Sequence, residues 1–149
     1  LRVYLDELDE LYEEVQKKHL GVPLIRLERL RSPLKQLAAV AQSYEKNLAA
    51  AMSDKLGHDY HTVNAILRKV EQAMGRPEGL PHPREWYRHQ IYAPGFYTGY
   101  GVKTIPGIRE AIEQHDWSTA KRQVGVVKEV FEAVTRQIHK ATRALQETL

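Results

Sequence analysis

Two histidines three positions apart are the first residues of this sequence that could do chemistry. His58 and His61 could lie on one side of the start of a helix and bind a zinc ion there. Zinc sites have three or four protein ligands, often in a fixed spacing such as HExxH. Neither that motif nor a third ligand is evident, and the chain contains no cysteine. We therefore predict no metal site in this chain and interpret the pair as exposed residues at a helix N-terminus.

The other residue types that could catalyse a reaction also lack the surroundings they need. Acidic residues are dense only near the N-terminus, in the run DELDE and the pair EE. General acids need a shielded pocket that shifts their pKa, whereas these residues lie opposite an apolar helix stripe, so we expect a solvated face. No serine has a GxSxG context, and no GxxxxGK[ST] phosphate loop occurs. The sequence predicts no catalytic residue.

The stretch RHQIYAPGFYTGYGVKTIPGI, at residues 88–108, is unlike the helical segments around it. Six of the fifteen residues at positions 86–100 are aromatic. Connections between helices usually have about two to eight residues, so a connection this long needs a reason. Two interpretations stay open. The rings could cap the end of a helical bundle, or the glycine-rich backbone and the tyrosines could form a recognition surface.

Composition limits the class of protein. The chain has 149 residues, which favours one domain, with 42% hydrophobic and 28% charged residues. The net charge is +3 without any block of five or six like charges, so we expect neither nucleic acid nor a membrane surface as a partner. No run approaches the ~18 apolar residues of a membrane span. The chain begins with Leu1 inside a helical pattern, and we expect it to be a piece of a longer protein.

Apolar residues recur at spacings of three and four in four long segments. These segments are residues 1–18, 27–56, 59–75 and 117–149, with regular helix in the second beginning near Ser32 and a shorter helix at 105–116. No alternating strand pattern competes. We predict an all-α protein, an antiparallel four-helix bundle with a long aromatic and glycine-rich loop and one extra short helix.

Local signals indicate where these helices begin and how they pack. Ser32, Asp59 and Ser118 each stand where a side chain could cap a helix N-terminus, and Gly57 could end the second helix. Gly125 lies inside the last helix, where glycine costs about 1 kcal/mol relative to alanine. We expect a close contact with another helix at that position.

Several strings of the sequence resemble one family over nearly the whole chain. GLP, WYRHQIYAPG, GY and IPGIREAI are similar to the transferrin receptor-like dimerisation domain of glutamate carboxypeptidase-like zinc peptidases. The flanking helices LKQLAAVAQSYEKNL, NAILRKVEQAM and AKRQVGVVKEVFEAVTRQIHKATRAL are similar to the helices of that domain. The resemblance implies a linking helix at residues 1–21, continuous with the bundle, and a single dimerisation domain at 22–149, excised from a larger protein.

The resemblance also implies a function for the larger protein. In this family the dimerisation domain is C-terminal and pairs two subunits into a homodimer. Its long loop contacts the catalytic domain and forms part of the pocket for the peptide substrate. That catalytic domain would hold two zinc ions and would precede residue 1, so we expect no cofactor and no peptidase activity in this chain alone. The whole protein would be secreted, periplasmic or membrane-anchored, with this domain outside the cytoplasm.

The substrate-binding residues of the family carry over only in part. A Lys-Tyr pair in this loop binds the side chain of a C-terminal glutamate. Tyr100 matches the tyrosine, whereas Gly99 occupies the lysine position. Lys103 lies nearby, and we hypothesise that it substitutes for the missing lysine. Two alternatives differ in class: a non-catalytic, receptor-like module that binds proteins, and a free-standing helical bundle unrelated to peptidases.

Overall fold

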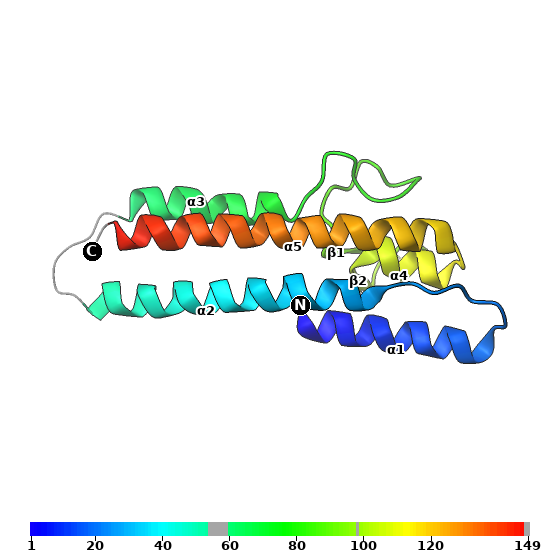
Figure 1. The fold of residues 1–149 in the computed structure, drawn as a ribbon. Helices are drawn as coiled ribbons and strands as arrows, with labels where there is room; N and C mark the ends of the chain where they lie inside the picture. Colours follow the sequence, from blue (N-terminus) through cyan, green and yellow to red (C-terminus); the bar gives the residue numbers. More distant parts are fainter. Residues whose placement is uncertain (54–59, 98, 148–149) are drawn as a thin grey trace.

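The computed structural model describes residues 1–53, 60–97 and 99–147, and helices dominate it (Figure 1). The α-helices among these residues are α1 (Arg2–Lys18), α2 (Arg31–Ser53), α3 (His61–Ala73), α4 (Pro106–Glu113) and α5 (Trp117–Gln146). A 3₁₀ turn, η1 (Leu27–Leu30), precedes α2, and the strands β1 (Tyr92–Pro94) and β2 (Val102–Thr104) lie in the long loop. The all-α class is confirmed. Within the described ranges, no helix is both long and apolar enough to cross a membrane.

The longest helix, α5, is the centre of the packing. Both α2 and α3 pack along it, and α1, η1 and α4 gather at the end where α5 begins (Figure 1). The four long helices alternate in direction along the chain: α1 and α3 run opposite to α2 and α5, so the packed neighbours α2 and α5 share one direction. The reason is the path of the chain. It returns along α3, and the loop and α4 then lead into α5 at the same end from which α2 starts.

The hydrophobic core follows the apolar stripe of α5. Val127, Val130 and Phe131 are almost completely buried, against leucines of α1 and η1 and isoleucines of α4. A smaller cluster closes the other end of the molecule around Val63 and Leu145. The periodicity of the last helix therefore identified the core correctly, because a helix at the centre of a bundle buries one continuous face.

The start of α2 is close to the prediction. The 3₁₀ turn η1 directly precedes the helix, and regular helix begins at Arg31, next to the predicted start near Ser32. Ser32 lies inside the helix, so its predicted role as an N-cap is wrong, because η1 runs directly into α2 and leaves no free helix end there. The predicted end at Gly57 and the predicted cap at Asp59 fall outside the described residues.

The N-cap of α5 also differs from the prediction. Asp116, not Ser118, caps the helix: its Oδ1 accepts a hydrogen bond from the backbone N–H of Thr119 at 3.0 Å. Hydrogen bonding from the Thr119 side chain, together with this backbone bond, stabilises the ionised carboxylate and lowers the pKa of Asp116 below its ordinary value. Ser118 is already the second residue of the helix, and its Oγ accepts instead from Arg122.

The predicted close contact at Gly125 is absent. Gly125 faces solvent, and a Cβ placed there would meet nothing within 4 Å. The close contact lies at Gly107 instead, where a Cβ would be 2.5 Å from Oε1 of Gln123. Gly107 thus lets α4 approach α5 closely, and nothing in the described part of the chain accounts for the glycine in α5.

Polar contacts as well as apolar ones hold α1 against the rest of the molecule. Arg31 donates to Oδ1 of Asp6 at 2.6 Å and also to Asp9, and these two carboxylates raise the pKa of its guanidinium. Glu7 accepts from Arg109 at 3.2 Å. These three carboxylates lie on a solvated face as expected, with side chains 36–50% exposed, but they also bind partners that lie far away in the sequence.

A buried tyrosine joins α1 to the segment that follows it. The Tyr12 hydroxyl donates to the carbonyl of Pro23 at 2.8 Å and accepts from the backbone N–H of Ile25 at 2.9 Å. The ring itself is buried in the core. One side chain therefore satisfies two backbone groups that have left regular structure and would otherwise lack a partner.

We predict that Tyr12→Phe lowers the free energy of unfolding by about 1–3 kcal/mol, because it leaves a buried N–H and a carbonyl without their hydrogen bonds. Urea unfolding followed by circular dichroism measures the change. Tyr4→Phe is the matched control, since Tyr4 packs against the same core from the same helix. The control should change stability by less than about 0.5 kcal/mol. Equal effects of the two variants would contradict the prediction.

Candidate functional site

The long connection between α3 and α4 is an ordered structure of two lobes. The first lobe is tied to its own base by backbone hydrogen bonds, from Arg76 to Arg88 and from Leu80 to Tyr87. The second lobe is an antiparallel hairpin in which β1 pairs with β2 in the register Tyr92↔Thr104, Ala93↔Lys103 and Pro94↔Val102. The hairpin was not predicted, because its strands have only three residues each and a strand pattern needs about four or more residues to be read from sequence.

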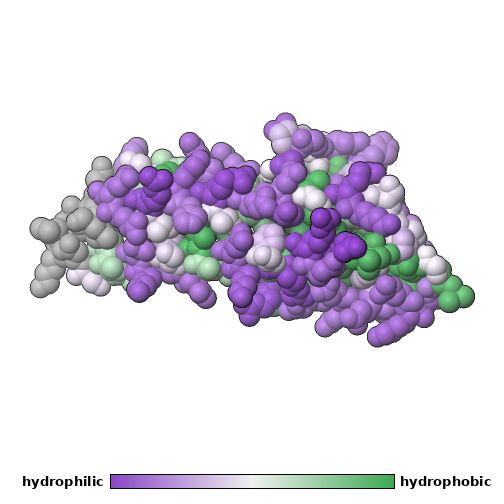
Figure 2. Space-filling view, viewed as in Figure 1, coloured by the Kyte–Doolittle hydropathy of each residue, from purple (hydrophilic) through white to green (hydrophobic). Residues whose placement is uncertain are grey.

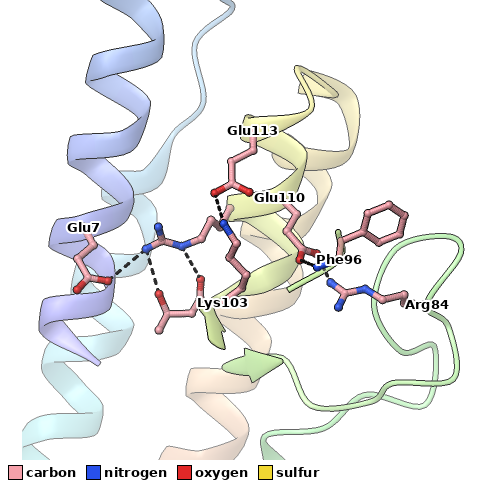
Figure 3. Close-up of polar contacts among 8 residues, drawn as sticks. Glu7, Arg84, Phe96, Lys103, Glu110 and Glu113 are labelled. Carbon is pink, nitrogen blue, oxygen red and sulfur yellow. Dashed lines mark hydrogen bonds and ion pairs between the residues drawn. The ribbon is translucent and has the colours of Figure 1, made fainter. Parts of the chain in front are cut away.

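A buried ion pair fastens both lobes to α4. Arg84, from the first lobe, donates to Glu110 of α4 and to the carbonyl of Pro94 at 2.6 Å. The second oxygen of Glu110 accepts from the backbone N–H of Phe96 at 2.9 Å, and the Arg84 guanidinium lies 5.6 Å from the centre of the Phe96 ring (Figure 3). The side chains of Arg84 and Glu110 are only 12% and 11% exposed. Each member of the pair therefore has its charge compensated and its hydrogen bonds satisfied.

Two further contacts secure the hairpin from the other side. Lys103 of β2 pairs with Glu113 of α4 at 2.8 Å (Figure 3). Arg109 of α4 donates to the carbonyl of Thr104 at 3.1 Å and to its hydroxyl at 3.0 Å, while also binding Glu7 of α1. The hairpin is thus joined through α4 to α1, the first helix of the chain.

The junction between the hairpin and α4 has a strained backbone. Ile105 is completely buried and has a φ of +48°, in the left-handed region that β-branched residues avoid. Its N–H donates to the carbonyl of Ile91 at 2.7 Å, which closes the base of the hairpin. Burial of the side chain and this hydrogen bond offset a strain of about 1–3 kcal/mol. The left-handed turn at Ile105 thus joins the closed base of the hairpin directly to the start of α4.

The first lobe contains a buried amide that organises its backbone. Gln90 is 1% exposed, and its Nε2 donates to the carbonyls of Gly79 at 3.0 Å and Arg88 at 2.9 Å. Its own N–H donates to the carbonyl of Met74 at the end of α3. These bonds satisfy carbonyls that a loop would otherwise present to water, and they fix the lobe against the helix.

Most of the aromatic rings of the connection face solvent. Trp86 is 74% exposed, Tyr97 78% and Tyr100 100%. Their rings do not cover the end of the bundle, so the interpretation of the loop as a cap does not hold for these three. Large apolar side chains left open on an anchored frame are typical of interaction surfaces. This exposure favours the interpretation of the loop as a recognition surface.

The three predicted site residues are neighbours in the sequence, but they do not share one pocket in the structure. Gly99 has a φ of +66°, a conformation that a lysine at the same position would adopt only with strain. Tyr100 is fully exposed beside it, and both line a shallow depression on the hairpin. Lys103 does not line this depression, and its ammonium group is paired with Glu113. A substrate carboxylate would have to compete with Glu113 for that group.

A polar cluster of three side chains lies where the first lobe meets α3. Nδ1 of His89 accepts from the backbone N–H groups of Ile91 and Tyr92, both at 3.3 Å, so in the neutral ring the proton is on Nε2. That nitrogen is 3.2 Å from Oε1 of Glu71. The Tyr92 hydroxyl donates to the same oxygen at 3.2 Å, which raises the pKa of the phenol. The cluster holds the start of β1 in place.

The described ranges contain no set of side chains that could bind a metal ion. No group of three or more His, Asp or Glu side chains there is arranged to hold an ion. His61 is the first residue of α3, and its proposed companion His58 falls outside the described residues.

The residues that build the frame were not identified from the sequence. Arg84, Gln90 and Glu110 are each at least nine-tenths buried or nearly so, but neither their type nor their spacing distinguishes them from surface residues. The available signal was weak: an arginine within a proline-rich loop, followed 26 positions later by a glutamate on the apolar side of a short helix.

These features define a class: an all-α domain that carries a long, anchored connection with exposed aromatic rings. Comparison with protein families places the chain more closely. Residues 25–146 match the transferrin receptor-like dimerisation domain, and the chain belongs to this family. The match includes α2 to α5 and the entire loop.

Two curated relatives agree with the family match. A probable glutamate carboxypeptidase of Arthroderma benhamiae is 31% identical over 111 residues, which cover 68% of this chain and 14% of the relative. The probable glutamate carboxypeptidase LAMP1 of Arabidopsis thaliana is 31% identical over 145 residues, which cover 96% of this chain and 19% of the relative. The chain thus spans less than a fifth of the length of either relative.

We predict that Glu110→Gln lowers the free energy of unfolding by about 3 kcal/mol, because it leaves the Arg84 guanidinium buried without a counter-charge. Glu113→Gln, in the same helix, breaks the partly exposed pair with Lys103 and should cost about 1 kcal/mol or less. Urea unfolding of both variants makes the comparison, since each makes the same chemical change. Equal losses would show that the Arg84 pair is no more than a surface contact.

Proposed function

We propose that this chain is the dimerisation domain of a glutamate carboxypeptidase-like zinc peptidase. In this proposal the helices pair two subunits, and the long loop forms one wall of the substrate pocket of a catalytic domain outside residues 1–149. The observation that carries the proposal is the combination of exposed rings, such as Tyr97 and Tyr100, with a frame that is held by buried polar contacts. A loop that contributes to a pocket in another domain must be rigid and must leave its recognition groups open.

The family and the two relatives support this proposal. Both relatives are described as probable glutamate carboxypeptidases, and both extend far beyond the region shared with this chain. The proposal includes the division of the chain into a linking helix at 1–21 and the dimerisation domain at 22–149. It also includes a four-helix bundle in which α1 joins α2, α3 and α5. The two zinc ions and the catalytic groups belong to the catalytic domain, so this chain alone should not hydrolyse peptides.

For the substrate pocket, we assign roles to the residues at the tip of the hairpin and in β2. Tyr100 offers a ring and a hydroxyl to the C-terminal side chain of the peptide. Gly99 provides no side chain where the family has a lysine, so the positive charge has to come from elsewhere. Lys103 can supply it by exchanging Glu113 for the carboxylate of the substrate, since both partners of the present pair are about one-third exposed.

The second candidate function is a receptor-like module that binds proteins without catalysis. The fully exposed ring of Tyr100 favours it as well, because aromatic side chains are enriched in protein interfaces. The two candidates differ in what accompanies the domain: zinc ligands and a catalytic glutamate in the first case, and none in the second.

The dimerisation half of the proposal predicts that the isolated chain forms a dimer in solution. Apolar surface on the bundle would be buried between subunits, and stable subunit interfaces commonly bury about 2,000 Å² or more. Light scattering after size exclusion, over a wide range of protein concentration, measures the mass. A monomer at the highest concentration would contradict the idea that these helices suffice for assembly.

The pocket half predicts a change in substrate preference in the complete protein. Lys103→Ala should lower kcat/KM for a peptide with a C-terminal glutamate by about tenfold or more relative to one with glutamine, because a hydrogen bond to a charged group is lost. Glu113→Gln should raise the same preference, because it releases Lys103 from its pair. The two rates, measured side by side, test both variants.

Lys140→Ala is the control for this experiment, since Lys140 is exposed on the last turns of α5, away from the loop. The role assigned to Lys103 is wrong if Lys103→Ala and Lys140→Ala leave the same preference. Loss of activity toward both peptides to the same degree would indicate a general defect in folding.

A further inference from the structure

An open groove of about 630 Å³ lies between α5 and the segment that leads from α1 into η1, away from the hairpin. Its floor includes Gly125, the helical glycine that has no close neighbour in this chain. Glycine inside a helix is unfavourable, and it is useful where another backbone must approach closely. Since nothing in the described part of the chain makes that approach, the space above Gly125 is available to another molecule.

Four basic side chains surround the groove. Arg26 and Arg29 come from the segment after α1, and Lys121 and Lys128 from α5. Arg29 and Lys121 have no ion-pair partner among the residues that the structure describes. Arg26 has only a weak pair with Glu28, at 3.9 Å. The arrangement presents positive charge that this chain does not neutralise.

The acidic groups of the groove are already engaged. Glu129 pairs with Arg76 at 2.6 Å, and Glu132 lies 3.7 Å from Lys128. They leave the uncompensated charge of the groove positive, but they would repel a continuous row of phosphates. The groove therefore suits discrete carboxylates better than the backbone of a nucleic acid.

Apolar side chains lie beside this charge. Leu24 lines the groove and is 62% exposed, and Leu20 nearby in the same segment is fully exposed. Figure 2 shows the result on the surface: a green strip over the segment after α1, directly beside purple side chains. A partner that fits would offer an apolar side chain to Leu24 and carboxylates to the arginines and lysines.

A second copy of this chain does not offer such a surface from its most acidic helix. In α1, Asp6 and Asp9 bind Arg31, and Glu7 binds Arg109. Glu13 and Glu14 pair with lysines one turn later in the same helix. The dense acidic run of the sequence is thus largely neutralised within its own molecule.

We propose that this groove is a docking site for an acidic polypeptide segment with an apolar residue among its carboxylates, bound against Gly125 of α5. Arg29 and Lys121 bind the carboxylates, Leu24 contacts the apolar side chain, and Gly125 allows the segment to lie close to the helix. The site is independent of the hairpin, so it stands whether or not the loop forms a substrate pocket.

The experiment measures binding of a fluorescein-labelled peptide that repeats Leu-Glu-Glu, by fluorescence anisotropy at low salt. Two further peptides separate the contributions: Leu-Gln-Gln repeats lack the charge, and Ser-Glu-Glu repeats lack the apolar residue. We expect the first peptide to bind at least tenfold more tightly than either of the others, and its binding to weaken as salt is added.

Variants of the groove test the site itself. Gly125→Leu fills the groove and should weaken peptide binding at least tenfold while raising the melting temperature, because leucine favours helix. The double variant Arg29→Glu and Lys121→Glu should weaken binding at least as much. Lys140→Glu makes the same kind of substitution elsewhere on α5, with half of the charge change of the double variant, and should leave the affinity within about twofold.

Five outcomes would overturn the proposal. They are unchanged binding in Gly125→Leu, equal binding of the Leu-Glu-Glu and Leu-Gln-Gln peptides, and a loss in Lys140→Glu as large as in the double variant. The fourth is binding to vesicles of anionic lipid that shows the same sensitivity to the variants while the peptide does not bind. A dimer of this chain that Gly125→Leu converts to monomer would assign the groove to a second copy instead.

Discussion

The ion pair between Arg84 and Glu110 is the contact on which the long loop depends. It joins three separate segments: the proline-rich first lobe, the turn after β1, and α4. Ile91 and Ile105 anchor the base of the hairpin in the hydrophobic core, whereas most of its rings face solvent. Beyond this base, buried polar contacts hold the loop in place. Because removal of either partner leaves the other charge buried alone, the three segments are held together or released together.

The helices could be predicted because each depends on a local pattern of apolar residues in its own segment. Apolar residues at spacings of three and four located α1, α3 and α5 to within a few residues, and a single face of α5 accounts for most of the core. Signals at the helix ends were less informative. Ser118 and Asp116 both stand near the start of α5, and either can cap a helix. Only the path of the chain determines which of them is the last residue outside the helix. Strands of three residues gave no period to detect.

The framework of the loop could not be predicted, since it depends on pairs that are distant in sequence. Arg84 meets Glu110 across 26 positions, and Glu7 meets Arg109 across 102. A single sequence carries no record of such pairs. The acidic residues of α1 show the consequence. Their composition indicates a solvated surface, but α1 packs beside Arg31 and Arg109, and the same residues become its points of attachment. What the motifs did locate correctly was the connection itself, through its length and its aromatic content.

The hairpin separates a part of the chain that must stay constant from a part that is free to vary. Its two ends are fixed by Glu110, Arg109 and the base at Ile105, whereas Tyr97 and Tyr100 at the tip leave their side chains exposed. Substitutions at the tip change exposed side chains and leave the core untouched, so they cost little stability. The exposed side chains of the tip can therefore change in evolution while the chain keeps its fold.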